Sequence, residues 1–182
     1  MGNRILIAAG GTGGHLLPAL HVARALLAVD RNCEILFVGG GRALEERLIT
    51  KAGYARVTLP LKGVTGLGLA GIFRFAAGLP GAVIAVYRLL RSFKPAVVLG
   101  MGGYASFLPV LLASLRRIPT WIHEAEQGPG LANRALALFV SRISLAFPDV
   151  RMPRQERCVY TGHPVNPDLA TIGKQPMPES IS

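Results

Sequence analysis

The sequence is poor in cysteine, in aromatic residues and in long hydrophobic runs near its start. Cys33 and Cys158 are the only cysteines among 182 residues, and they lie far apart without metal-binding or redox spacing. We therefore expect two reduced structural thiols and no disulfide framework. Aromatic residues make up 7% of the chain and hydrophobic residues 51%, which suits an α/β domain with buried aliphatic strands. The first hydrophobic run spans only about five residues, too few for a secretory signal peptide.

Acidic residues are absent between Arg47 and His123, and the excess positive charge of the chain lies in this stretch. The formal net charge is +10, and the gap holds ten of the twenty Lys and Arg residues, so the remaining ten balance the ten acidic residues. The same stretch is strongly hydrophobic, which fits an anionic membrane surface better than nucleic acid. We find no recognition motif or stacking aromatics and expect no nucleic-acid partner. An ordinary basic surface is the alternative.

Hydrophobic runs alternate with helical patterns along most of the chain. This alternation predicts an α/β fold, a single Rossmann-like domain over residues 1–165 with a mostly parallel sheet, followed by a linker or loose tail over 166–182. Residues 96–115 carry no charge, but glycines and a proline interrupt them, so we expect a strand, a turn and a helix rather than a membrane span. The expected strands are 4–9, 34–39, 56–59, 96–99, 120–123, 143–146 and 158–160, and the expected helices are 16–29, 44–52, 70–93 with a break at Pro80-Gly81, and 131–140.

Two glycine turns follow hydrophobic strands. Gly10–His15 reads GGTGGH after the first strand, and Gly100–Tyr104 reads GMGGY after the fourth. Small residues let the backbone approach a ligand, and a helix that starts there offers free N–H groups to an anion. Right-handed crossovers bring both turns to one carboxyl edge, which predicts a cleft for a phosphorylated molecule. His15 could move a proton near neutral pH, or it is a structural residue at the start of the helix.

Four motifs in this order, G-G-T-G-G-H, G-M-G-G-Y, H-E and G-x-P-V, resemble one family. From about Ile5 to Val165 the chain is similar to the N-terminal half of the bacterial lipid II synthases of peptidoglycan assembly. These are undecaprenyldiphospho-muramoylpentapeptide β-N-acetylglucosaminyltransferases, the MurG-like enzymes of glycosyltransferase family 28, with the two-domain GT-B fold. Asn133-Arg134 and Ala146-Phe147-Pro148 extend the likeness.

The resemblance implies an inverting hexosyltransferase half-enzyme that moves N-acetylglucosamine from UDP-GlcNAc to a lipid-diphosphate-linked muramoyl peptide. In the family, the N-terminal domain takes the polyprenyl-diphosphate acceptor and docks on the membrane. A second domain holds most of the UDP-sugar, and we expect this donor-binding domain to be absent here and supplied by another domain or polypeptide. The implied location is cytoplasmic, peripheral on the inner face of the cell membrane.

The resemblance also implies site residues. His15 would be the general base that deprotonates the acceptor hydroxyl. Because Asp30, Asp149 and Asp168 are isolated, we expect no metal and no other cofactor. The acceptor and its diphosphate would contact Thr12, Gly13, Gly14, Gly102, Gly103, Tyr104, His123, Glu124 and Asn133. The membrane face would include Phe73, Arg74, Phe75, Tyr87, Arg88, Arg91 and Lys94.

Some alternatives remain open. His123 and Glu124 are either a catalytic pair or an ordinary loop histidine beside an exposed acid. The chain also departs from the family's H-E-Q-N at 123–126 and from its G-N-P-V-R at 162–166, where an arginine expected near the donor phosphates is lost. The second functional hypothesis is a catalytically inactive module that binds a membrane surface or a lipid diphosphate. A dinucleotide-dependent oxidoreductase is disfavoured, because the third glycine of that fingerprint and an acid after the second strand are missing.

Overall fold

A computed structural model describes residues 3–60 and 69–166, with the backbone alone for residues 69–77. The described strands form one sheet in the order β3-β2-β1-β4-β5-β6-β7, and every neighbouring pair is parallel. The α/β prediction is confirmed, and the sheet is parallel throughout. The strands are β1 (Arg4–Ala8), β2 (Glu34–Gly39), β3 (Ala55–Thr58), β4 (Val97–Gly100), β5 (Thr120–Glu124), β6 (Arg142–Leu145) and β7 (Cys158–Tyr160).

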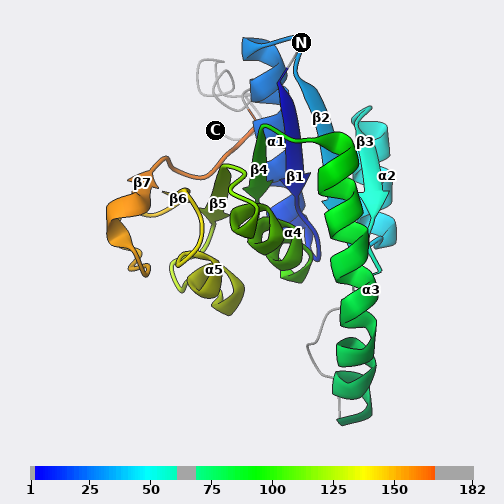
Figure 1. Ribbon diagram of the computed structural model, residues 1–182. Coiled ribbons are helices and arrows are strands. Elements are labelled where there is room, and N and C mark those ends of the chain that lie inside the picture. Colours follow the sequence, from blue (N-terminus) through cyan, green and yellow to red (C-terminus); the bar gives the residue numbers. More distant parts are fainter. Residues whose placement is uncertain (1–2, 61–68, 167–182) are drawn as a thin grey trace, which may run out of the picture.

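Helices cover both faces of the sheet. Helices α1 (Gly13–Val29) and α2 (Ala43–Lys51) contact each other on one face. On the other face, α4 (Tyr104–Leu115) contacts both α3 (Leu69–Phe93) and α5 (Leu131–Leu136). Figure 1 shows α3 and α4 in front of the sheet and α1 behind it. The helices change face because the chain crosses the sheet in one direction up to β3 and in the opposite direction afterwards, always with right-handed connections.

The alternating side chains of the strands divide the core into two hydrophobic clusters. On β1, Leu6 belongs to the cluster beneath α3 and α4, and Ile7 belongs to the cluster beneath α1. Both side chains are fully buried, and burying a residue of this size stabilises the fold by about 1.5–3 kcal/mol. Since β1 and β4 lie at the centre of the sheet, the turns that follow them rest on strands that are paired on both sides.

Three helix boundaries differ from the prediction. Helix α3 is continuous through Pro80, and the expected break is wrong. Proline removes one intrahelical N–H, but the buried Ala82, Val86 and Leu90 hold the following turns against the sheet. Helix α1 starts three residues earlier than expected, inside the glycine turn, and α5 ends at Leu136 instead of residue 140. Of the tail expected over 166–182, residues 167–182 lie outside the described residues.

The uncharged stretch 96–115 forms β4, the second glycine turn and α4, as predicted. Within the part of the chain that the structure describes, no helix is both long and apolar enough to cross a bilayer.

Candidate functional site

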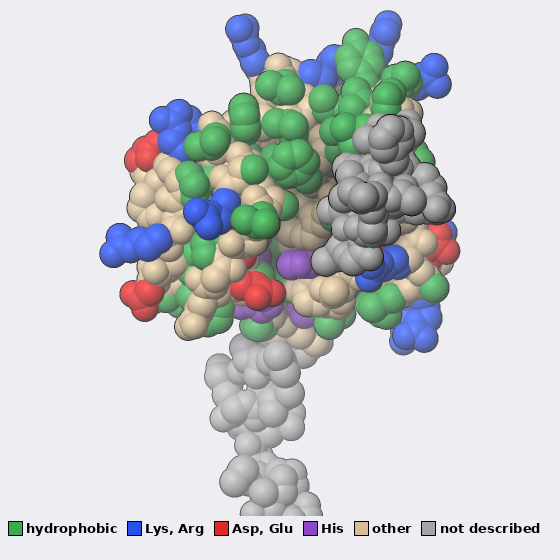
Figure 2. Space-filling model, turned by 90° about the horizontal axis from the view of Figure 1, so that it is seen from below, with side chains coloured by type: hydrophobic (Ala, Val, Ile, Leu, Met, Phe, Trp, Pro, Cys, Tyr) green, Lys and Arg blue, Asp and Glu red, His purple; other side chains and the backbone are tan. Residues whose placement is uncertain are grey.

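The two glycine turns touch at the carboxyl edge of the sheet. Gly102 and Gly103 have φ angles of 97° and 77°, which residues with a side chain rarely adopt. A Cβ atom on Gly103 would overlap the carbonyl oxygen of Gly10 in the first turn. The missing side chains therefore let the turns approach, and the prediction that they share one edge is confirmed. Figure 2 looks onto this edge and shows histidine side chains, in purple, near the middle of the face.

His15 lies between the two turns. Its side chain is half-buried, and a Cβ atom built on Gly102 would stand 2.6 Å from the imidazole Nδ1. Nδ1 is buried and has no hydrogen-bond partner among the residues that the structure describes, so this nitrogen faces glycine backbone and not an orienting carboxylate. Nε2 is then the nitrogen through which His15 can exchange a proton with a bound molecule.

Helix α1 begins within the first turn, with the exposed Thr12 as its N-cap residue. Apart from the adjoining backbone, no atom of the described residues lies within 4 Å of a Cβ built on Gly13, and at Gly14 only the Thr12 hydroxyl does, at 3.6 Å. The first N–H groups of a helix lack acceptors within it and carry the positive end of its dipole. The space beside Gly13 and Gly14 can therefore admit an anion, and α4 starts at Tyr104 on the same edge.

One donor of the first turn is already in use. The N–H of Gly11 donates to Oε1 of Glu45 at 2.8 Å, and Glu45 is 4% exposed on α2. Sequence analysis did not select Glu45. The signal that could have found it is the glycine run at 39–41 just before it, because a Cβ atom on Gly39 would stand 2.7 Å from Oε2 of Glu45. An anion at this turn relies on Gly13 and Gly14 instead of Gly11.

Tyr104 packs between the turns that follow β1, β2 and β4. Its side chain is half-buried, and a Cβ atom on Gly40 would overlap its hydroxyl oxygen. Its ring also stands 3.9 Å from a Cβ built on Gly11. Tyr104 therefore lies beside the first turn, where the resemblance implied acceptor contacts, and it also helps to pack the edge.

His123 is the penultimate residue of β5 and is 4% exposed. Its Nδ1 lies 2.9 Å from the hydroxyl oxygen of Ser144, and that hydroxyl donates to the carbonyl oxygen of Ile122 at 3.3 Å. The hydroxyl proton is thereby committed, so Ser144 accepts from His123, and Nδ1 carries the imidazole proton. Nε2, which is buried without a partner, is then a hydrogen-bond acceptor. Ser144 was not selected from the sequence, because its role depends on the pairing of β5 with β6.

Three histidines lie near one another at this edge. The ring centres of His123 and His163 are 5.8 Å apart. Burial, followed by the charges of His163 and His15, lowers the pKa of His123 to about 4. His123 is therefore neutral near pH 7. In the described residues, these side chains do not form a group that could hold a metal ion.

Glu124 and Asn133 hold the loop that follows β5. The Glu124 carboxylate accepts from the N–H groups of Glu126 at 3.1 Å and Gly130 at 3.2 Å, and from the Asn133 amide at 3.0 Å. The Asn133 amide also donates to the carbonyl oxygen of His123 at 3.1 Å. Glu124 is buried, so the alternative of an exposed acid is wrong. These hydrogen bonds favour a positioning role for Glu124 over a catalytic pair with His123.

A cavity of about 410 Å³ adjoins His123. Its walls are mainly apolar and come from α1 (Val22, Leu26), from Trp121 on β5 and from the segment after β7, where Pro164 contributes. Helix α1 also contacts the segment after β7 through Nδ1 of His21, which is 3.2 Å from the carbonyl oxygen of Pro164. In its neutral form, His123 offers this cavity a single acceptor nitrogen.

The residues expected to face a membrane lie along α3 and just beyond it. Tyr87, Arg88, Arg91 and Lys94 are exposed, and the Arg116 guanidinium lies 4.6 Å from the centre of the Tyr87 ring. The side chains of Phe73, Arg74 and Phe75 lie outside the described residues. Figure 1 shows the N-terminal part of α3 projecting past the carboxyl edge of the sheet.

Comparison with known proteins gives a family and a fold. Residues 5–145 match the glycosyltransferase family 28 N-terminal domain. The chain is 39% identical over 183 residues to a protein of Nitratidesulfovibrio vulgaris (strain Hildenborough), named UDP-N-acetylglucosamine--N-acetylmuramyl-(pentapeptide) pyrophosphoryl-undecaprenol N-acetylglucosamine transferase. It is 40% identical over 173 residues to a protein of the same name from Solidesulfovibrio magneticus. The alignments cover 98% and 92% of this chain but 50% and 45% of the relatives, so the chain spans about half their length.

Solved structures show the same fold. The crystal structure of Acinetobacter baumannii MurG superposes with a TM-score of 0.71 at 23% identity, over 99% of this chain and 47% of that one. A UDP-GlcNAc 2-epimerase from Neisseria meningitidis superposes with a TM-score of 0.60 at 16% identity, over 88% of this chain and 46% of that one. At these identities, the likeness extends to the fold alone.

Proposed function

The chain belongs to glycosyltransferase family 28, and from this premise we propose that it is the acceptor-binding half of an inverting N-acetylglucosaminyltransferase. Its acceptor is a polyprenyl-diphosphate-linked muramoyl peptide, and its donor is UDP-GlcNAc held by a second domain or polypeptide. Residues 1–165 are the acceptor domain in this proposal, and 166–182 are a linker or loose C-terminal tail. No metal or other cofactor takes part.

One observation carries the proposal: His15 stands between two glycine turns at a single sheet edge. The open backbone at Gly13 and Gly14, together with two helix N-termini, supports a diphosphate there. Gly102 and Gly103 let the second turn come close to the same ligand.

The chemistry is a single displacement. The acceptor hydroxyl oxygen attacks the anomeric carbon of the donor sugar, the bond to the UDP oxygen breaks, and Nε2 of His15 takes the hydroxyl proton. The backbone N–H groups and helix dipoles stabilise the acceptor's phosphate charge. Tyr104 and His123 line the acceptor cleft, with Glu124 and Asn133 holding the loop beneath it.

The protein works at the inner face of the cell membrane, as a peripheral cytoplasmic protein that docks through α3. The support is the exposed row of Tyr87, Arg88 and Arg91 near the C-terminal end of α3. Basic side chains among exposed apolar ones suit an anionic lipid surface.

The test reconstitutes transfer. The full chain is supplied with the C-terminal half of the Nitratidesulfovibrio vulgaris relative, as a separate polypeptide and as a fusion, together with UDP-GlcNAc and the lipid-linked acceptor. We expect transfer in at least one arrangement, and a loss of about 10²–10⁴-fold in kcat on His15→Ala. His21→Ala, on the same helix, is the matched control and should leave kcat within a few-fold. Absence of transfer in every arrangement would refute the enzymatic role.

A module that binds the lipid diphosphate without catalysis is the second candidate. It is favoured by the missing partner at His15 Nδ1, because a catalytic imidazole is usually oriented through its second nitrogen. In that case, His15→Ala would leave the biological activity unchanged.

A further inference from the structure

The turn that follows β2 sends a cationic side chain towards the candidate diphosphate site. Arg42 is the N-cap residue of α2, and its Nη1 donates to the carbonyl oxygen of Gly11 at 2.8 Å. Its guanidinium carbon lies 5.9 Å from the centre of the Tyr104 ring. One exposed guanidinium therefore contacts residues of both glycine turns.

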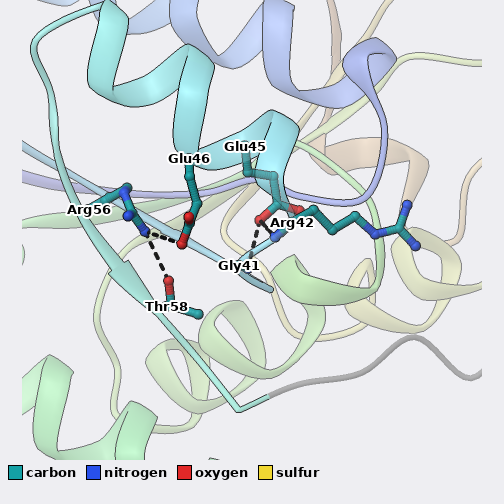
Figure 3. Close-up of polar contacts among 6 residues, drawn as sticks. All are labelled: Gly41, Arg42, Glu45, Glu46, Arg56 and Thr58. Carbon is teal, nitrogen blue, oxygen red and sulfur yellow. Dashed lines mark hydrogen bonds and ion pairs between the residues drawn. The ribbon is translucent and has the colours of Figure 1, made fainter.

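Glu45 fixes the backbone from which Arg42 extends. The Oε2 atom of Glu45 accepts from the N–H of Gly41 at 2.9 Å and from that of Arg42 at 3.4 Å (Figure 3). The Oε1 atom accepts from the N–H of Gly11. A single buried carboxylate thus joins the turn after β1 to the turn after β2. The base of the Arg42 side chain and the first glycine turn are held in one arrangement before any ligand arrives.

The negative charge of the Glu45 carboxylate opposes the binding of an anion at this turn, and the positive charge of Arg42 can offset it. Glu45 takes up one N–H of the turn and adds a negative charge beneath it, and both effects oppose a diphosphate at the same place. Neither acid of the first turn of α2 forms an ion pair with the Arg42 side chain, because Glu45 accepts backbone N–H groups and Glu46 pairs with Arg56 at 2.8 Å (Figure 3). Among the described residues, the guanidinium contacts a carbonyl oxygen and an aromatic ring and forms no ion pair.

From this arrangement we infer that Arg42 is a cationic ligand of the acceptor diphosphate, an inference that rests on the proposed function. A guanidinium has five N–H donors in a fixed fork that matches phosphate oxygens, and here one recorded bond uses one of them. Arg42 thereby offsets the Glu45 charge and adds a third chain segment to a site otherwise built from two turns.

The test uses the full chain and inorganic pyrophosphate, with affinities measured by isothermal titration calorimetry at low salt. We expect Arg42→Gln to raise the Kd about tenfold or more, since it removes charged hydrogen bonds. Arg42→Lys, which keeps the charge and loses the fork, should raise it less. Arg47→Gln is the matched control, because Arg47 is an exposed arginine of the same helix α2 and its loss changes the net charge by the same amount. It should change the Kd less than twofold.

Each outcome decides one question. Binding by the unsubstituted chain that survives Arg42→Gln overturns the role of Arg42 and leaves the diphosphate site standing. An equal loss in Arg42→Gln and Arg47→Gln also overturns that role, because it reports net charge alone. No binding by the unsubstituted chain overturns the diphosphate site of the proposed function, and the role of Arg42 with it. Thermal unfolding of each variant checks the fold, and if Arg42→Gln unfolds, a Kd unchanged in Arg42→Lys refutes recognition by the fork.

Discussion

Two glycine runs at the carboxyl edge are similar in sequence and differ in their surroundings. At Gly39–Gly41, after β2, the position of each missing Cβ is occupied, by the Glu45 carboxylate, the Tyr104 hydroxyl and the Thr58 methyl group in turn. At Gly13 and Gly14, after β1, the same positions are open or nearly so. The glycines at 39–41 make room for neighbouring side chains, whereas Gly13 and Gly14 leave room for a ligand. We call Gly39–Gly41 the filled run, because it packs against other turns, and Gly13-Gly14 the open run, because it forms the candidate binding surface.

The largest test of this comparison is Gly103→Ala, which adds a methyl group where two turns already touch. We expect the free energy of unfolding to fall by at least about 3 kcal/mol, because left-handed strain and overlap with the Gly10 carbonyl act together. Gly53→Ala is the matched control, with a φ angle of 78° and no atom within 4 Å, and it should cost about 1–2 kcal/mol in urea unfolding. Equal losses in the two variants would show that the turns do not press on each other.

The filled run also depends on its buried carboxylate. Glu45→Ala leaves the N–H groups of Gly11 and Gly41 without their acceptor, and we expect a loss of about 2–3 kcal/mol. Glu46→Ala, one residue along the same helix, removes only a partly exposed ion pair with Arg56 and should cost less than about 1 kcal/mol. Equilibrium urea unfolding of both variants measures the difference. If the Glu46 variant were as unstable as the Glu45 variant, the Glu45 carboxylate would not be what holds the turns after β1 and β2 together.

The pH dependence of the free energy of unfolding tests whether the buried surroundings of His123 disfavour a charged imidazole. Burial lowers the pKa of His123 from 6.5 to about 4, so between these values the unfolded chain binds the proton and the folded chain does not. Stability from this group is therefore complete above pH 6.5 and is lost as the pH falls towards 4, by about 2–3 kcal/mol. His123→Gln should remove this part of the pH dependence, as measured by urea unfolding from pH 7 to 4. If the pH dependence of stability were the same in the variant, the folded protein would not disfavour the charged form of His123.

The smallest expected change in stability is at the open run. Gly13→Ala places a methyl group in empty space at the start of a helix, so the free energy of unfolding should change by less than about 0.5 kcal/mol. Pyrophosphate affinity should fall several-fold, because the methyl group stands where the ligand approaches. A large loss of stability, or an unchanged affinity measured by calorimetry, would remove the distinction between the two runs.

The sequence predicted the fold well because hydrophobic runs and glycine turns are local signals. The order of strands and helices, and the meeting of the turns after β1 and β4, followed from alternation and from right-handed connections. The start of α1 was missed, because two glycines with low helix propensity form its first turn. The break at Pro80 was wrong, because tertiary packing of the later turns outweighs the lost hydrogen bond.

The polar framework of the site could not be predicted in the same way. Glu45 accepts from Gly11, 34 residues earlier in the chain, and the hydrogen bond from His123 to Ser144 spans 21 residues. No spacing rule connects such pairs, since they meet only after the sheet has formed. Position 40 requires glycine because the side chain of Tyr104, which is likewise remote in the sequence, occupies the space beside it.

The close contact of Tyr104 with Gly40 has an evolutionary consequence. Position 40 cannot accept a side chain alone, because such a side chain needs a smaller residue at 104. In homologous sequences, we expect a side chain at 40 to occur only together with a smaller residue at 104, although the two positions are distant along the chain. Gly41 is constrained further, because its φ angle of 77° disfavours a side chain even if Thr58 becomes smaller.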